Sequence, residues 1–227
     1  MKNKTKVWDF PTRLFHWLLA ASLPFMWYSA KAGGDMLQWH TRVGLLVLFL
    51  LVFRLCWGIW GSDTARFSRF VRGWAGIRGY LKNGIPEHIQ PGHNPLGALM
   101  VVALLAAVSF QVGTGLFAAD ENTFSTNGYL NHLVSEHTGS LIRKIHLNFF
   151  KLLAVFSAVH IAAVAAYRIF KKKNLVRPMI TGFKYIEGKT SIRFAGKAAL
   201  AAALSVAALA AALSVAALAA AAILLLS

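Results

Sequence analysis

Two histidines, His146 and His160, lie within the apolar stretch from Ile145 to Tyr167. They are fourteen residues apart, so an α-helix would return them to the same face within ~40° and separate them by ~21 Å along its axis. The stretch is long enough to cross a bilayer, which would put one histidine near each membrane surface. Ionisable side chains at such depths are rare and usually functional. The spacing therefore predicts two stacked cofactors held on one helix face.

Two further histidines complete the pattern. His16 lies about one turn into the first apolar segment, and His40 begins the second. Their expected depths pair His40 with His146 toward the outer surface, and His16 with His160 toward the cytoplasmic surface. Two imidazoles fill both axial positions of a six-coordinate electron-transfer haem. The sequence thus predicts two haems, with these four histidines as iron ligands and without the C-x-x-C-H motif of covalent attachment.

Three other residues are candidates for haem binding. Arg54 follows His40 by fourteen residues, so it shares that helix face at the depth of the inner pair. A buried arginine needs an anion, and the haem propionates would supply one, although a snorkelling arginine remains an alternative. Arg42 is predicted to serve the outer haem in the same way. Gly44, one turn from His40, would let a flat macrocycle approach the backbone, but small residues also pack helices together.

Two histidines outside the pairs leave alternatives open. His93 stands at the cytoplasmic entry to the third apolar segment. It is a candidate for a quinone or propionate site, although the helix cap expected from Asn94 and Pro95 explains the local sequence equally well. His137 competes weakly with His146 as the outer ligand, because it would break the fourteen-residue register.

Composition indicates an integral membrane protein, since 57% of the residues are hydrophobic and 14% are charged. Five segments reach the ~20 residues that a spanning helix needs. They are Thr12–Ala30, Leu37–Trp60, Pro95–Ala118, Leu141–Phe170 and Ala198–Leu226. The last is rich in alanine and contains AALSVAALA twice in succession. It lacks charged and aromatic groups, so we assign it packing and no chemistry.

The net charge of +16 would suggest nucleic acid in a soluble protein. Here the basic residues lie between apolar segments, which indicates membrane topology and contact with lipid headgroups, not nucleic acid. Most of the Lys and Arg residues precede the first segment, follow the second, or lie between the fourth and fifth. The N-terminus is therefore expected in the cytoplasm and the C-terminus in the periplasm.

Several of these stretches resemble the bacterial cytochrome b561 family, which is related to the b-type cytochrome subunits of nickel–iron hydrogenases. The similar segments are VWDFPTRLFHWLL, WHTRVGLLVLFLLVFRLCWG, GHNPLGALMVV, TGLFAADE, IHLNFFKLLAVFSAVH and NLVRPMITG, and together they cover roughly Lys6–Lys184. The resemblance implies a four-helix bundle that binds two haem b groups and passes electrons between quinones and partner redox proteins. By the same resemblance, His16 and His160 would hold the inner haem, and His40 and His146 the outer one.

The expected fold is therefore an all-α membrane protein, with a four-helix transmembrane bundle holding two haems and a fifth, Ala-rich transmembrane helix. We expect a di-haem domain over residues 1–184, and a cytoplasmic linker with the additional helix over residues 185–227.

The expected function is electron transfer across the bacterial inner membrane between the quinone pool and a redox partner. That partner would be a periplasmic c-type cytochrome or a dehydrogenase or hydrogenase subunit. One alternative is an enzyme that acts on superoxide or another substrate at the outer haem, where Arg42, Arg143 and Lys144 would attract an anion. Another is a membrane anchor for a hydrogenase or dehydrogenase. The sequence does not decide between an enzyme and an electron carrier, or between a monomer and a homo-oligomer.

Overall fold

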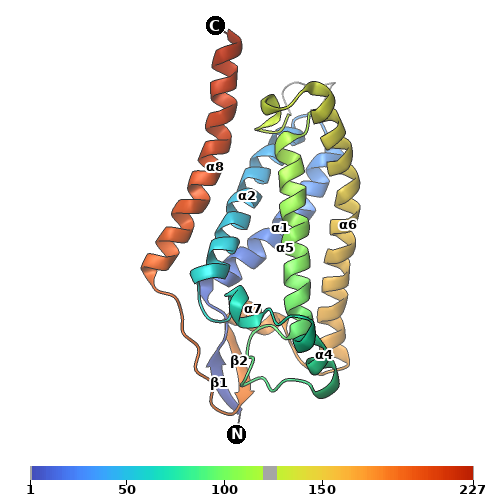
Figure 1. Ribbon diagram of the computed structural model, residues 1–227. Helices are drawn as coiled ribbons and strands as arrows, with labels where there is room; N and C mark the ends of the chain where they lie inside the picture. The colour runs from blue at the N-terminus through green and yellow to red at the C-terminus, as the bar shows by residue number, and fades with distance from the viewer. Residues whose placement is uncertain (1, 120–126, 227) are drawn as a thin grey trace. The chain divides into compact units, whose positions relative to one another are not determined.

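The computed structural model describes residues 2–119 and 127–226, and its architecture is almost entirely helical (Figure 1). The long helices are α1 (Phe10–Ala32), α2 (Met36–Trp60), α5 (Pro95–Phe117), α6 (Glu136–Ile169) and α8 (Lys197–Leu226). The shorter elements are β1 (Lys2–Lys6), α3 (Phe67–Phe70), α4 (Trp74–Asn83), the 3₁₀ helix η2 (Asn131–Leu133), α7 (Val176–Thr181) and β2 (Phe183–Glu187). The predicted all-α membrane class is confirmed.

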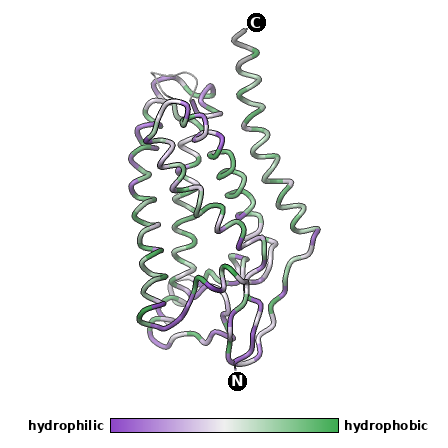
Figure 2. Tube along the Cα trace, turned by 180° about the vertical axis from the view of Figure 1, so that it is seen from behind, coloured by the Kyte–Doolittle hydropathy of each residue, from purple (hydrophilic) through white to green (hydrophobic). Residues whose placement is uncertain are grey.

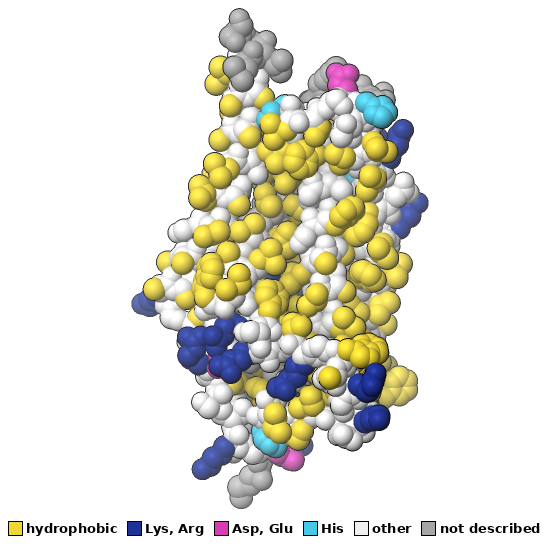
Figure 3. Space-filling model, viewed as in Figure 1, with side chains coloured by type: hydrophobic (Ala, Val, Ile, Leu, Met, Phe, Trp, Pro, Cys, Tyr) yellow, Lys and Arg dark blue, Asp and Glu magenta, His cyan; other side chains and the backbone are white. Residues whose placement is uncertain are grey.

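Among the described residues, four helices are long and apolar enough to cross a membrane. They are α2, α5, α6 and the Lys197–Ala221 part of α8. Figure 2 shows their predominantly hydrophobic colouring, and Figure 3 shows the apolar side chains that cover the helices on one face. Large side chains such as Val155 and Ile161 are exposed on α6, as expected for a surface that faces lipid. α1 covers the predicted span Thr12–Ala30 and has the length of a span, but it is not among these four helices, because residues such as Arg13, His16 and Lys31 lower its hydropathy.

The chain divides into two compact units that each take a portion of the helices α1, α2, α5 and α6. Unit 1 comprises Met1–His16, Arg54–Leu104 and Phe156–Ala203, and unit 2 comprises Trp17–Phe53, Leu105–Val155 and Leu204–Ser227. In unit 2, the side chains of Val47, Leu50 and Leu51 from α2 and of Leu153 from α6 are buried and belong to the hydrophobic core.

In unit 1, the two strands pair antiparallel and bring the N-terminus to the segment after α6. Lys2 lies opposite Glu187 in this ladder, and Lys6 opposite Phe183. Gly182 ends α7 with φ +85°, a conformation that favours glycine. Its carbonyl accepts the backbone N–H groups of Val7 at 2.8 Å and Trp8 at 3.1 Å. The strands therefore fix the entry to α1, where a small core of Val7, Trp8 and Ile186 is buried.

Candidate functional site

The structure brings the four histidines together as the two predicted pairs. In unit 1, the ring centroids of His16 and His160 are 6.4 Å apart. In unit 2, those of His40 and His146 are 6.3 Å apart. All four side chains are half-buried. Each pair therefore unites one residue of the α6 stretch with one from α1 or α2.

These separations match the space that a haem requires. With ~2 Å from each imidazole nitrogen to a metal ion and ~1 Å from that nitrogen to the ring centre, two imidazoles on opposite sides of one iron have centroids ~6 Å apart. Among the described residues, no group of three or more His, Cys, Asp or Glu side chains could hold a metal ion. Two imidazoles are too few for a typical protein zinc site, but they are the complete axial set of a haem.

In the pair of unit 2, hydrogen bonds set the orientation of both rings. His40 Nδ1 lies 3.0 Å from the Met26 carbonyl, and His146 Nδ1 lies 3.0 Å from the Gln111 carbonyl. A carbonyl can only accept, so each Nδ1 carries the proton and each Nε2 keeps its lone pair. The Gln111 amide lies 3.2 Å from His146 Nε2, toward which it can donate. The second nitrogens thus have the protonation state that a metal ligand needs.

Helix α5 also supplies a close backbone approach to His146. A Cβ atom at Gly115 would lie 2.9 Å from His146 Cε1, closer than side chains tolerate, whereas a Cβ at Gly113 would meet nothing within 4 Å. The Thr114 hydroxyl lies 3.0 Å from His146 Nδ1. Gln111, Thr114 and Gly115 are spaced i, i+3 and i+4, so they share one helix face and together seat the ring.

Arg54 is buried in unit 1, with an exposed fraction of 3%. Its guanidinium lies 4.8 Å from the centroid of the Phe67 ring and has an attractive charge interaction with Asp9. Within the described chain, Arg54 Nη1 has no hydrogen-bond partner. A buried N–H group without an acceptor is costly, so this atom favours an anionic ligand such as a haem propionate.

His93 belongs to the same surroundings. Its ring packs at 4.8 Å from the rings of both Trp8 and Phe70, and its Nδ1 has no hydrogen-bond partner in the described residues. Burial of the ring, followed by the charge of Arg54 and the neighbouring His16 and His160 rings, lowers the pKa of His93 to about 3. His93 is therefore a neutral group beside the inner pair at physiological pH.

The predicted cap beside His93 is present. Asn94 Oδ1 accepts the backbone N–H of Gly97 at 2.8 Å, one turn into α5. Its amide also donates to the Tyr167 hydroxyl at 2.8 Å. The Asn94 side chain thus caps the start of α5, and the His93 ring packs against Trp8 and Phe70.

Asp9 links α1 to α2 within unit 1. Its carboxylate accepts the backbone N–H of Thr12 at 2.8 Å, which caps α1. It also accepts the indole N–H of Trp57 at 3.0 Å. Asp9 is buried, and sequence reasoning missed it, although an Asp directly before an apolar segment is a helix-start signal.

The remaining predicted residues contact other side chains or lie exposed. Arg42 is exposed and stacks 5.1 Å from the centroid of the Trp39 ring. A Cβ at Gly44 would make an ordinary 3.8 Å contact with Met26 Cε. His137 is exposed in the first turn of α6, so the ring beside His40 belongs to His146.

Sequence reasoning missed Gln111 and Thr114 as part of the seat of His146, although both are polar residues that share one face of an otherwise apolar helix. These two polar residues could have indicated the seat, because polar groups within an apolar helix usually face the bundle interior.

Comparison with known proteins agrees with the geometry. A family model described as prokaryotic cytochrome b561 matches residues 7–182. The resemblance noted in the sequence covers nearly the same range, roughly Lys6–Lys184. No curated protein and no solved structure matched the chain. The match covers most of the sequence, the fold is helical and membrane-spanning, and the ring separations of the paired histidines are compatible with haem. The chain belongs to the prokaryotic cytochrome b561 family, whose members are membrane-bound b-type cytochromes that bind haem b and take part in transmembrane electron transfer.

Proposed function

We propose that this protein is a di-haem cytochrome that carries electrons across the bacterial inner membrane between the quinone pool and a redox partner. The observation that carries the proposal is the pair of ring separations, 6.4 Å for His16 and His160 and 6.3 Å for His40 and His146. One such pair would support a single haem. Two pairs, linked through α6, support two haems in one chain.

Each haem, when bound, supplies the one-electron chemistry of its iron. The chain would ligate the iron, orient the histidine rings and neutralise the propionates. The Met26 and Gln111 carbonyls accept hydrogen bonds from Nδ1 of His40 and His146, which would leave the Nε2 lone pairs available to a metal. Arg54 would bind a propionate of the inner haem through its unpartnered Nη1. Arg42 and Gly44 remain proposed as contacts of the outer haem.

The proposed orientation has the N-terminus in the cytoplasm and the C-terminus in the periplasm. It rests on the charge distribution, since basic residues dominate β1, the α3–α4 region and the segment between α6 and α8. Residues 1–184 would then form the haem domain, and residues 185–227 a linker and an additional helix. The redox partner is proposed to be a periplasmic c-type cytochrome or a dehydrogenase or hydrogenase subunit.

Gly115→Ala should disturb the outer haem and leave the inner one intact. Its new Cβ would lie 2.9 Å from His146 Cε1, so the ring must move away from its seat. We expect roughly half of the haem absorbance to be lost or its reduced bands to shift. Gly113→Ala is the matched control, because a Cβ there meets nothing within 4 Å. Identical spectra of the two variants would contradict the proposed seat of His146.

Electron transfer itself can be measured with the full chain in sealed vesicles that contain ferricyanide. A short-chain ubiquinol is added outside, and haem reduction and ferricyanide loss are followed by absorbance. We expect the wild-type vesicles to consume the enclosed acceptor, and protein-free vesicles and the His146→Ala variant to do so at least ~10-fold more slowly. Haem that the quinol reduces without loss of ferricyanide would contradict transfer across the membrane, and haem that it does not reduce would contradict the quinone assignment.

A further inference from the structure

A basic cavity of about 810 Å³ opens in unit 1, where β1, the loop after α4, and the segment from α6 to β2 meet. Its volume suits a small ligand or a lipid headgroup. Two acidic side chains, Glu87 and Glu187, line it beside six basic ones. The basic residues are Lys2, Lys4, Lys172, Lys173, Arg177 and Lys184.

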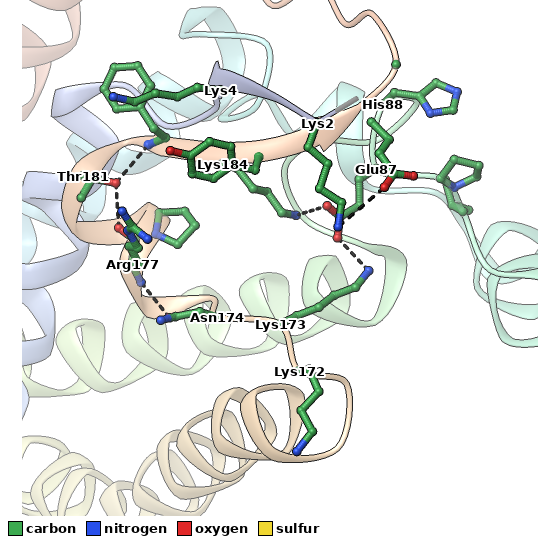
Figure 4. A pocket seen from close by; sticks show the side chains of 17 residues that line it. Lys2, Lys4, Glu87, His88, Lys172, Lys173, Asn174, Arg177, Thr181 and Lys184 are labelled. Carbon is green, nitrogen blue, oxygen red and sulfur yellow. Dashed lines mark hydrogen bonds and ion pairs between the residues drawn. The ribbon is translucent and has the colours of Figure 1, made fainter.

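The acids neutralise only part of this charge. Lys173 donates to Glu87 at 2.7 Å and Lys184 approaches the same carboxylate at 3.3 Å, while Lys2 lies 3.6 Å from Glu187 (Figure 4). Burial raises the pKa of Glu87, but the hydrogen bond from Lys173 and the charge of Lys184 outweigh it, so the pKa is below its ordinary value. Glu87 is therefore ionised at neutral pH.

Three cations of the cavity are not neutralised by an ion pair with a described residue. No described carboxylate lies within ion-pair distance of Lys4, Lys172 or Arg177. Lys4 packs 4.8 Å from the centroid of the Phe183 ring, and Lys172 and Arg177 are exposed. Figure 4 shows Lys172 directed away from the lysines that surround Glu87. The cavity is thus a cationic site with unsatisfied capacity for an anion.

Exposed apolar side chains flank the same cations. Ile169 and Phe170, at the end of the membrane-spanning α6, are 58% and 78% exposed, and Ile180 in α7 is 57% exposed. Lysines directly beside exposed apolar groups at the end of a spanning helix are typical of the headgroup level of a bilayer. A soluble anion would explain the charge but not these apolar neighbours.

We propose that the cavity lined by Lys4, Lys172 and Arg177 binds the phosphate-bearing headgroup of an anionic glycerophospholipid from the cytoplasmic leaflet. Arg177 contacts the phosphate, Lys172 contributes its charge from the edge of the cavity, and the acyl chains lie against Phe170 and Ile180. The site contains none of the proposed haem ligands, so its test does not depend on the proposed function.

The test is native mass spectrometry of the full chain, released from bilayer discs that contain equal amounts of phosphatidylglycerol and phosphatidylcholine. We expect wild type to retain phosphatidylglycerol selectively. Each removed charge should weaken retention about fivefold, so the double variant Lys172→Gln, Arg177→Gln should weaken it about 25-fold. The double variant Lys172→Arg, Arg177→Lys keeps both charges and should bind as wild type does, which shows that the charges and not the particular side chains are needed.

Arg78→Gln is the matched control, because Arg78 is also an exposed basic residue but does not line the cavity. It should retain the lipid normally. Equal losses in this control and in the Lys172, Arg177 double variant would overturn the proposal, since diffuse surface charge would then suffice. Phosphatidylglycerol in the discs should raise the unfolding temperature, whereas inorganic phosphate added to pure phosphatidylcholine discs should not. If phosphate raises it as much as phosphatidylglycerol does, the lipid assignment is wrong.

Discussion

His146→Ala should remove the outer haem and spare the inner one, and His160→Ala should do the reverse. Each variant deletes one imidazole of a pair whose rings are 6.3 or 6.4 Å apart, and a six-coordinate haem cannot keep both axial bonds without it. His40→Ala should behave as His146→Ala does, and His16→Ala as His160→Ala does. We expect about half of the low-spin haem absorbance to remain in each case.

His137→Ala is the control for this series. His137 lies on the same helix, is exposed, and is not the ring beside His40. It should keep both haems, as measured by reduced-minus-oxidised spectra of protein purified from the same membranes. If any of the four paired histidines can be removed with both haems retained, the assignment of that ligand is wrong.

Asp9→Ala should destabilise unit 1 strongly. The substitution removes the acceptor of the Thr12 N–H and the Trp57 indole N–H. It also removes the charge that interacts favourably with buried Arg54. Losing a helix cap and one charge of a buried interaction costs about 3–5 kcal/mol. For a chain of this size we expect the unfolding temperature to fall by about 10 °C, measured by tryptophan fluorescence in detergent.

Asp9→Asn separates the two causes. Asparagine caps helices as well as aspartate does and can still accept from Trp57, but it carries no charge. Its unfolding temperature should fall about half as far as that of Asp9→Ala. Unfolding of the alanine variant at the wild-type temperature would show that Asp9 does not hold α1 and α2 together in the way described.

The sequence predicted the histidine pairs because helix geometry is local. Fourteen residues bring two side chains to one face whatever surrounds them, and the apolar pattern identifies which segments are helices. The depth of each histidine then follows from its place in its segment. The same reasoning put Arg54 at the level of the inner pair, and the structure has Arg54 buried in unit 1 with His16 and His160.

What the sequence could not predict depends on partners distant in the chain. The seat of His146 requires knowing that α5 packs against that ring, and no spacing rule names the neighbour of a helix. The β1–β2 pairing joins Lys2–Lys6 to Phe183–Glu187, and KNKTK has neither the apolar alternation nor the β-branched content that marks a strand. The strand register and the basic cavity that these strands help to line depend on contacts between distant parts of the chain.

The haem content of the purified full chain is the most direct measurement of the central claim. Alkaline pyridine haemochrome spectra, divided by protein concentration from amino-acid analysis, count haem b per polypeptide. Two imidazole pairs predict two haem b groups per chain, both low-spin in the ferrous state. A count of one, or a ferrous spectrum with a high-spin component of equal size, would contradict the assignment of both pairs as axial ligands.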